Sequence, residues 1–210
     1  MARAIKILVV VGLVVFVGLP LASRVMRSGK APLTAEEQQV WERLLGKHLS
    51  TTTVTPREED ADAVAAIGDK IVPYIESQFG NAAGVPGTFG KSEYWLIIVL
   101  ARIGSPQAID AVVKVLEHDF PGNIETDRET AAKALVWLGA TDRVSYLEAA
   151  IAAHEQAVAQ SSDPERYGVA VDNLKQYLEL LKKGEGKRDK SKFPFGPSLI
   201  KDSIWIPTPQ

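Results

Sequence analysis

Three histidines are the residues of this chain whose type most readily supports catalysis or metal binding. They are His48, His118 and His154, and none forms the HxxxH or HExxH pair that places two imidazoles on one helical face to hold zinc. Two of them precede a carboxylate, as His118-Asp119 and His154-Glu155, but neighbouring residues point in different directions on a helix. We therefore expect no catalytic residue and no metal site.

Other patterns that could carry chemistry are equally sparse. The chain has no cysteine, so disulfides, thiolate catalysis and thiolate metal sites are excluded. The loop from Gly80 to Gly90 has four glycines but lacks the lysine of a phosphate-binding loop. No GxSxG elbow or dinucleotide fingerprint occurs, and we expect no cofactor.

An acidic run of Glu58, Glu59, Asp60 and Asp62 coincides with the first turn of a predicted helix. Carboxylates are favoured there by the helix dipole, so its placement has a structural explanation. The region from 31 to 183 contains 14 basic and 23 acidic residues, a net charge of -9. Such a surface repels a phosphate backbone, so we expect no nucleic-acid partner.

The N-terminal segment, residues 1–30, contains sixteen consecutive uncharged residues from Ile7 to Ala22. About 20 apolar residues span a bilayer, whereas signal-peptide cores hold about 7 to 15. Arg24, Arg27 and Lys30 follow at once, and no clear small-x-small cleavage site is present. We expect a membrane anchor with the body on the extracytoplasmic side, periplasmic or at the cell surface. Secretion after cleavage of a signal is the alternative.

A repeat organises the rest of the chain. The segments VAAIG, LARIG and LVWLG end in Gly68, Gly104 and Gly139, which are 36 and 35 residues apart. Each glycine falls where a helix would end in a left-handed cap, and each precedes a new periodic stretch. Every repeat is therefore predicted to be helix, tight turn, helix.

The hydrophobic pattern predicts helices over 34–48, 56–67, 70–79, 91–103, 106–117, 127–138, 142–160 and 164–182, with essentially no strand signal. Capping boxes mark three starts, at Thr34–Glu37, Thr55–Glu58 and Thr126–Glu129. Tyr94, Trp95 and Trp137 fall inside apolar helix patterns and are expected to pack in the core. The fold class is all-α, a short right-handed α-solenoid of about three helical hairpins plus flanking helices over 34–183.

The turn sequences resemble the HEAT-like repeat family of HEAT and armadillo-type hairpins. The residues that carry the resemblance are Ile67, Gly68, Asp69, Val72 and Pro73, followed by Ile103, Gly104, Pro106 and Ile109. Gly68, Asp69, Gly104, Pro106 and Gly139 are accordingly expected to be structural residues of the turns. In similar proteins the second helix of each hairpin lines a concave face that binds a partner, which implies that face here.

The C-terminal tail, residues 184–210, consists of a charged spacer and a proline-broken aromatic segment. Phe193, Phe195 and Trp205 either fold back over an exposed end of the solenoid or contact a partner.

These observations favour a membrane-tethered protein-protein interaction scaffold or assembly factor, without catalysis, whose protein partner the sequence does not identify. Two alternatives come from proteins with similar repeats. One is a bilin lyase-type enzyme, and the other is a DNA glycosylase, which the acidic charge opposes.

Overall fold

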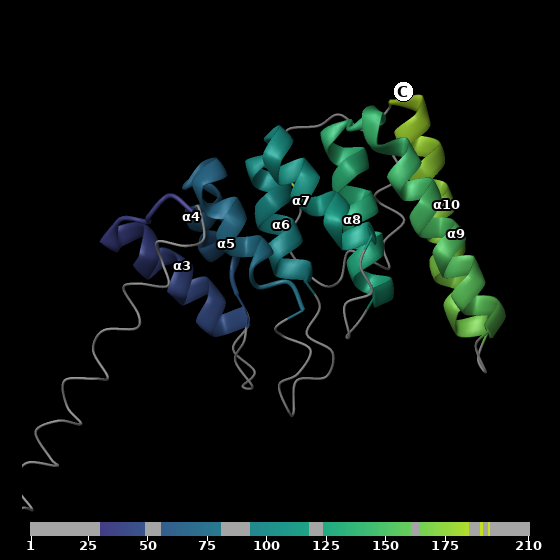
Figure 1. Ribbon diagram of the computed structural model, residues 1–210, viewed down its shortest axis with the longest axis horizontal. Helices are drawn as coiled ribbons and strands as arrows, with labels where there is room; N and C mark the ends of the chain where they lie inside the picture. Colours follow the sequence, from purple (N-terminus) through teal and green to yellow (C-terminus); the bar gives the residue numbers. More distant parts are fainter. Residues whose placement is uncertain are drawn as a thin grey trace, which may run out of the picture.

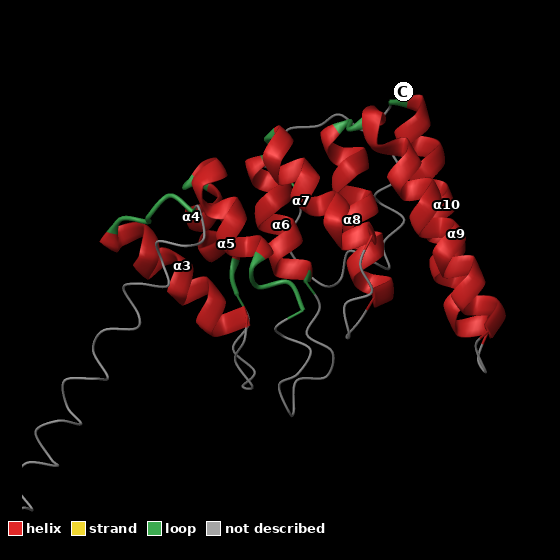
Figure 2. Ribbon diagram, in the orientation of Figure 1, coloured by secondary structure: helices red, strands yellow, loops and turns green. Residues whose placement is uncertain are grey.

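The structure is a computed structural model of the 210-residue chain, and it describes residues 30–48, 56–80, 93–117, 124–160 and 164–184 together with Lys190 and Phe193. All regular elements within these ranges are helical (Figure 2). They are α3 (Ala35–His48), α4 (Glu58–Ala65), the 3-10 helix η1 (Gly68–Ile71), α5 (Val72–Glu76), α6 (Tyr94–Ile103), α7 (Pro106–Glu117), α8 (Ile124–Leu138), the 3-10 helix η3 (Thr141–Arg143), α9 (Val144–Gln160) and α10 (Pro164–Lys183).

The helices form hairpins that follow one another along the long axis of the molecule (Figure 1). The first helices of the hairpins pack in sequence, α4 on α6, α6 on α8 and α8 on α10, and we call them the first-helix row. The second helices make another row, in which α5 packs on α7 and α7 on α9. Helix α3 precedes the hairpins and packs on α4. This is the stacked arrangement expected of an α-solenoid.

One continuous hydrophobic core runs through the stack, from Trp41 on α3 to Leu181 on α10. Helix α6 lies at its centre, and every residue from Tyr94 to Ile103 is buried except the half-buried Trp95. An apolar helix is the natural occupant of a position that neighbours cover on all sides. The single charged residue of that helix, Arg102, is buried with it.

Most predicted helices are confirmed, and α7 has the predicted bounds of 106–117. The predicted helix at 70–79 is wrong in detail, because the chain forms η1 and then a five-residue α5. Beyond Glu76 the backbone tightens into i to i+3 hydrogen bonds, from Gln78 to Ile75 and from Phe79 to Glu76. Helix α8 begins three residues earlier than predicted, at Ile124 rather than 127.

The hydrogen bonds at the helix starts test the three predicted capping boxes. Thr34 and Glu37 form the predicted capping box, with the Thr34 amide donating to Glu37 Oε2 at 2.6 Å and the Glu37 amide to Thr34 Oγ1 at 3.2 Å. The box predicted at Thr55–Glu58 is wrong, because α4 begins at Glu58 and Asp60 accepts the amide of Arg57 instead. The third, Thr126–Glu129, is also wrong, because both residues lie inside α8.

The apolar run from Ile7 to Ala22 lies outside the described residues. Within the part of the chain that the structure describes, no helix has the length and apolar character needed to cross a bilayer. The membrane anchor, the side of the membrane and the cleaved-signal alternative therefore stay predictions.

Candidate functional site

The turn residues predicted from the sequence lie where the hairpins reverse. Gly68, Gly104 and Gly139 have positive φ angles of 73°, 59° and 65°, the left-handed conformation that glycine adopts without steric cost. Asp69 is exposed within η1, and Pro106 begins α7, where its missing amide costs no helical hydrogen bond. These residues set the chain direction between the two helices of each hairpin.

The second-helix row carries the surface that the repeat resemblance implied for a partner. On α7 the side chains of Gln107, Asp110, Lys114 and Glu117 are all exposed. They recur at three- and four-residue steps, so they form one polar stripe along the helix. On α9 the largest exposed apolar side chain is Tyr146, with an exposed fraction of 37%.

Ion pairs connect α3, the second-helix row and the 3-10 helices η1 and η3, which precede α5 and α9. Lys70 of η1 donates to Glu37 of α3 at 2.5 Å, and Lys114 of α7 donates to Glu76 of α5 at 2.6 Å. The third pair joins Arg143 of η3 to Asp110 of α7 at 2.7 Å. We call these three pairs the ion-pair ladder.

In every pair of the ladder the acid comes from the earlier element and the base from the later one. The hydrogen bond from Lys70, helped by the backbone of Thr34, holds the pKa of Glu37 below its ordinary value. Partly exposed pairs contribute only about 0 to 1 kcal/mol each. The ladder therefore orders the surface and its register more than it stabilises the fold.

The only histidine whose side chain the structure describes, His154 on α9, is buried beside a polar stretch of α8. Five of the seven residues from 127 to 133 are polar and buried: Asp127, Arg128, Glu129, Thr130 and Lys133. Arg128 Nη1 lies 3.2 Å from His154 Nδ1, and Asn173 of α10 donates to Glu129 Oε1 at 2.9 Å. The start of α8 is thus joined to α9 and α10 by polar contacts.

Burial shifts the pKa of two groups in or beside this polar stretch. It lowers the pKa of Lys133 to about 8, although the charge of Glu129 acts in the opposite direction. Burial also raises the pKa of Tyr177 on α10 to about 12, and the charge of Glu129 adds to that shift. Perturbed groups concentrate at functional sites, but buried structural networks perturb them too. Here the contacts link α8, α9 and α10, so we assign this network a structural role.

A second buried charge, Arg102, joins two repeats in the first-helix row. Its guanidinium donates to Glu58 Oε1 at 2.9 Å and to Asp62 Oδ1, both on α4. The side chain of Arg102 is 2% exposed, whereas Glu58 and Asp62 are 62% and 57% exposed. The helix dipole therefore does not fully explain the acidic run, because two of its members fix the orientation of Arg102.

Of the tail aromatics, the structure describes Phe193, and Phe195 and Trp205 lie outside the described residues. Phe193 is 2% exposed and belongs to the core. Arg102 donates to its carbonyl oxygen, and its ring meets Trp137 of α8 edge to face. Phe193 thus packs against the middle of the stack, between α6 and α8, rather than over one of its ends.

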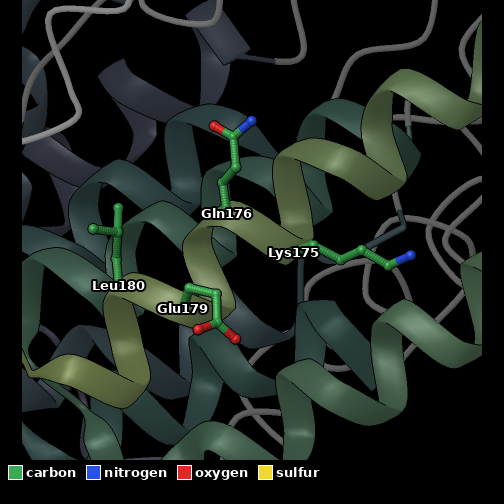
Figure 3. Close-up of a pocket in the computed structure, with 4 residues that line it drawn as sticks. All are labelled: Lys175, Gln176, Glu179 and Leu180. Atoms are coloured by element: carbon green, nitrogen blue, oxygen red, sulfur yellow. The ribbon is translucent and has the colours of Figure 1, made fainter.

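A shallow hollow of about 450 Å³ lies on α10 (Figure 3). Among the described residues it is lined by Lys175, Gln176, Glu179 and Leu180, all from that one helix. Ligand sites usually enclose a ligand with polar groups that converge from several elements. The described lining has no such convergence, so we assign no ligand to this hollow.

Stacked hairpins with left-handed glycine turns and a continuous core define a helical repeat protein. The family model of the PBS lyase HEAT-like repeat matches residues 94–118, which comprise α6, the turn at Gly104 and α7. Comparison with curated proteins and with solved structures gave no match. The chain therefore contains a HEAT-like repeat, in the hairpin that the sequence also identified.

Proposed function

We propose that this chain is a protein-protein interaction scaffold or assembly factor, held at a membrane, which binds its partner through the second-helix row and catalyses no reaction. The observation that carries this proposal is the ion-pair ladder, which joins α3 to η1, α5 to α7 and α7 to η3 along one polar surface. HEAT-like repeats generally mediate protein interactions. A rigid surface that spans several repeats suits an extended partner, because little side-chain entropy is lost on binding.

The N-terminal sequence supports the membrane part of the proposal. Sixteen uncharged residues from Ile7 to Ala22 stand between basic flanks, and the first described helix, α3, begins soon afterwards, at Ala35. Such a segment would hold the acidic helical body close to the bilayer, with the body on the extracytoplasmic side. Protease treatment of intact cells, with sequencing of the mature N-terminus, tests the anchor, the side and the cleavage together.

Site-specific photo-cross-linking in intact membranes tests the binding surface. A photoreactive amino acid would replace Gln107 on α7 or Ala149 on α9, both of which are exposed on the second-helix row. The matched control is Glu59, an exposed residue on α4 in the first-helix row. We expect one discrete cross-linked protein from both test positions and none from the control. Equal cross-linking from all three positions, or none from any, would refute the proposed surface.

The name of the matching family, PBS lyase HEAT-like repeat, favours one second candidate. That candidate is a bilin lyase-type enzyme, which attaches tetrapyrroles to proteins or detaches them. It predicts an absorbance change when the purified full chain is mixed with a bilin. A spectrum that equals the sum of the separate spectra would remove this candidate.

A further inference from the structure

Two residues of the C-terminal segment contact the first-helix row at points far away in the sequence. Arg102 donates to the carbonyl oxygen of Phe193 from Nε at 3.2 Å and from Nη2 at 2.9 Å, across 91 positions. Lys190 Nζ donates to the carbonyl oxygen of Ile103 at 2.5 Å. The amide of Phe193 donates to the carbonyl of Lys190 at 3.0 Å, so a local turn holds the two residues in fixed relation.

The receiving side of this contact is built from equivalent positions of successive hairpins. Arg102 and Trp137 each stand two residues before a capping glycine, Gly104 and Gly139 respectively. Stacking places them next to each other in the first-helix row, where α6 packs on α8. The ring centroids of Trp137 and Phe193 are 5.8 Å apart at an interplanar angle of 88°, the edge-to-face geometry that aromatic pairs prefer.

Gly104 contributes to the same contact by lacking a side chain. A Cβ at this position would lie 2.7 Å from Lys190 Cδ, so the lysine stem occupies the space that glycine leaves. At Gly68, the equivalent turn of the preceding hairpin, a Cβ would meet nothing within 4 Å. The turn at Gly68 therefore does not share the close approach seen at Gly104.

The contacts have the chemistry of peptide recognition. A guanidinium that donates two N–H groups to one backbone carbonyl positions a chain whatever its side chains are. Glu58 and Asp62 hold the guanidinium in orientation from α4. Among the described residues of the segment, two side chains select the sequence: the Phe193 ring packs against Trp137, and Lys190 donates to the carbonyl of Ile103.

We propose that Arg102, Trp137 and Gly104 form a recognition site for a peptide segment that presents phenylalanine with lysine three residues before it, and that the protein's own C-terminal segment fills this site in cis. The site lies on the first-helix row, so it is separate from the surface of the proposed function. A tethered ligand acts at an effective concentration in the millimolar range, so a segment of the same pattern from a partner must compete with it.

Fluorescence polarisation with a labelled peptide of residues 187–198 tests the site in the full-length chain. The Phe193→Ala variant removes the tethered ring and should bind this peptide. The wild-type chain should bind it about tenfold or more weakly, because its own segment competes. A peptide with alanine at Phe193 should not bind. Absence of saturable binding to the folded Phe193→Ala variant would overturn the proposal.

Matched variants separate recognition from general packing. In the Phe193→Ala background, Arg102→Met and Gly104→Ala should each weaken peptide binding at least about fivefold, because they act on the carbonyl contact and the lysine stem. Gly68→Ala, a change at the equivalent but open turn, should leave peptide affinity unchanged. Equal effects of Gly104→Ala and Gly68→Ala would overturn the assignment of the lysine contact.

Hydrogen exchange on the wild-type chain keeps the proposal testable if the Phe193→Ala variant does not fold. The amide of Phe193 is hydrogen-bonded, so it should be protected. Excess unlabelled peptide of residues 187–198 should speed its exchange while the amides of α6 stay protected, and the alanine-substituted peptide should not. Unchanged exchange at millimolar peptide would show that the segment is a fixed part of the core and would refute the recognition site.

Discussion

Arg102→Met is the substitution for which the structure gives the clearest prediction. Methionine keeps an unbranched apolar stem of similar length but removes every donor that the guanidinium supplies. The buried carbonyl oxygen of Phe193 then loses both hydrogen bonds from residue 102. The carboxylates of Glu58 and Asp62 are more than half exposed, so water can replace their lost partner.

The size of the effect follows from this difference in exposure. A buried acceptor left without a donor costs about 1 to 3 kcal/mol, whereas exposed ion pairs contribute about 0 to 1 kcal/mol each. We expect Arg102→Met to lower the free energy of unfolding by about 2 kcal/mol, with most of it lost at the Phe193 carbonyl. In a chain of this size that corresponds to a fall of about 4 to 8 °C in Tm.

Urea unfolding of the full chain, followed by far-ultraviolet circular dichroism, measures this change. The matched control is Glu59→Gln, which neutralises an exposed carboxylate of the same acidic run on α4 and keeps Glu58, Asp62 and the Phe193 carbonyl as partners of Arg102. We expect the control to lose less than about 1 kcal/mol. The reasoning is refuted if the control loses as much as Arg102→Met, or if Arg102→Met changes the stability by less than about 0.5 kcal/mol.

Three further predictions concern charge. Burial, opposed by a hydrogen bond from the Gly80 amide, raises the pKa of Glu93 to about 7, so urea titrations should show wild-type stability falling from about pH 4.5 to 7 while Glu93→Gln stays level. Burial lowers the pKa of Lys133 to about 8, so wild-type stability should rise from pH 8 towards 10.5, with no rise in Lys133→Met. Lys114→Glu should lower the free energy of unfolding by less than about 1 kcal/mol, and adding Glu76→Lys should restore it. The double-mutant cycle should therefore be non-additive, and additive effects would contradict the pairing.

The hairpins could be predicted from the sequence because their signals are local. Gly68, Gly104 and Gly139 end helices through their own backbone conformation, and the apolar period of α7 lies within twelve residues. Ser105 also caps α7, because its hydroxyl accepts the amide of Ala108 at 3.1 Å. Each of these signals lies within one helix or the turn next to it.

The tail contact could not be predicted in this way, because Arg102 and Phe193 are 91 positions apart. One signal was available, since Arg102 is the only charged residue in the helix YWLIIVLARI. A charge in a helix that is buried on all sides needs a polar partner, but the sequence does not say which one. The polar start of α8 was missed for a similar reason, because His154 and Asn173 reach it from other helices.

The pairing of Arg102 with Phe193 also bears on how the protein unfolds. In an open stack each hairpin contacts only its neighbours, so the repeats can come apart one after another from an end. Here a contact between positions 102 and 193 closes a loop that contains α7, α8, α9 and α10. Separation of α10 from the end of the stack therefore also weakens the contact between the C-terminal segment and Arg102 of the central helix α6. The repeats should consequently unfold in one cooperative transition, and the end of the chain, not its middle, sets that cooperativity.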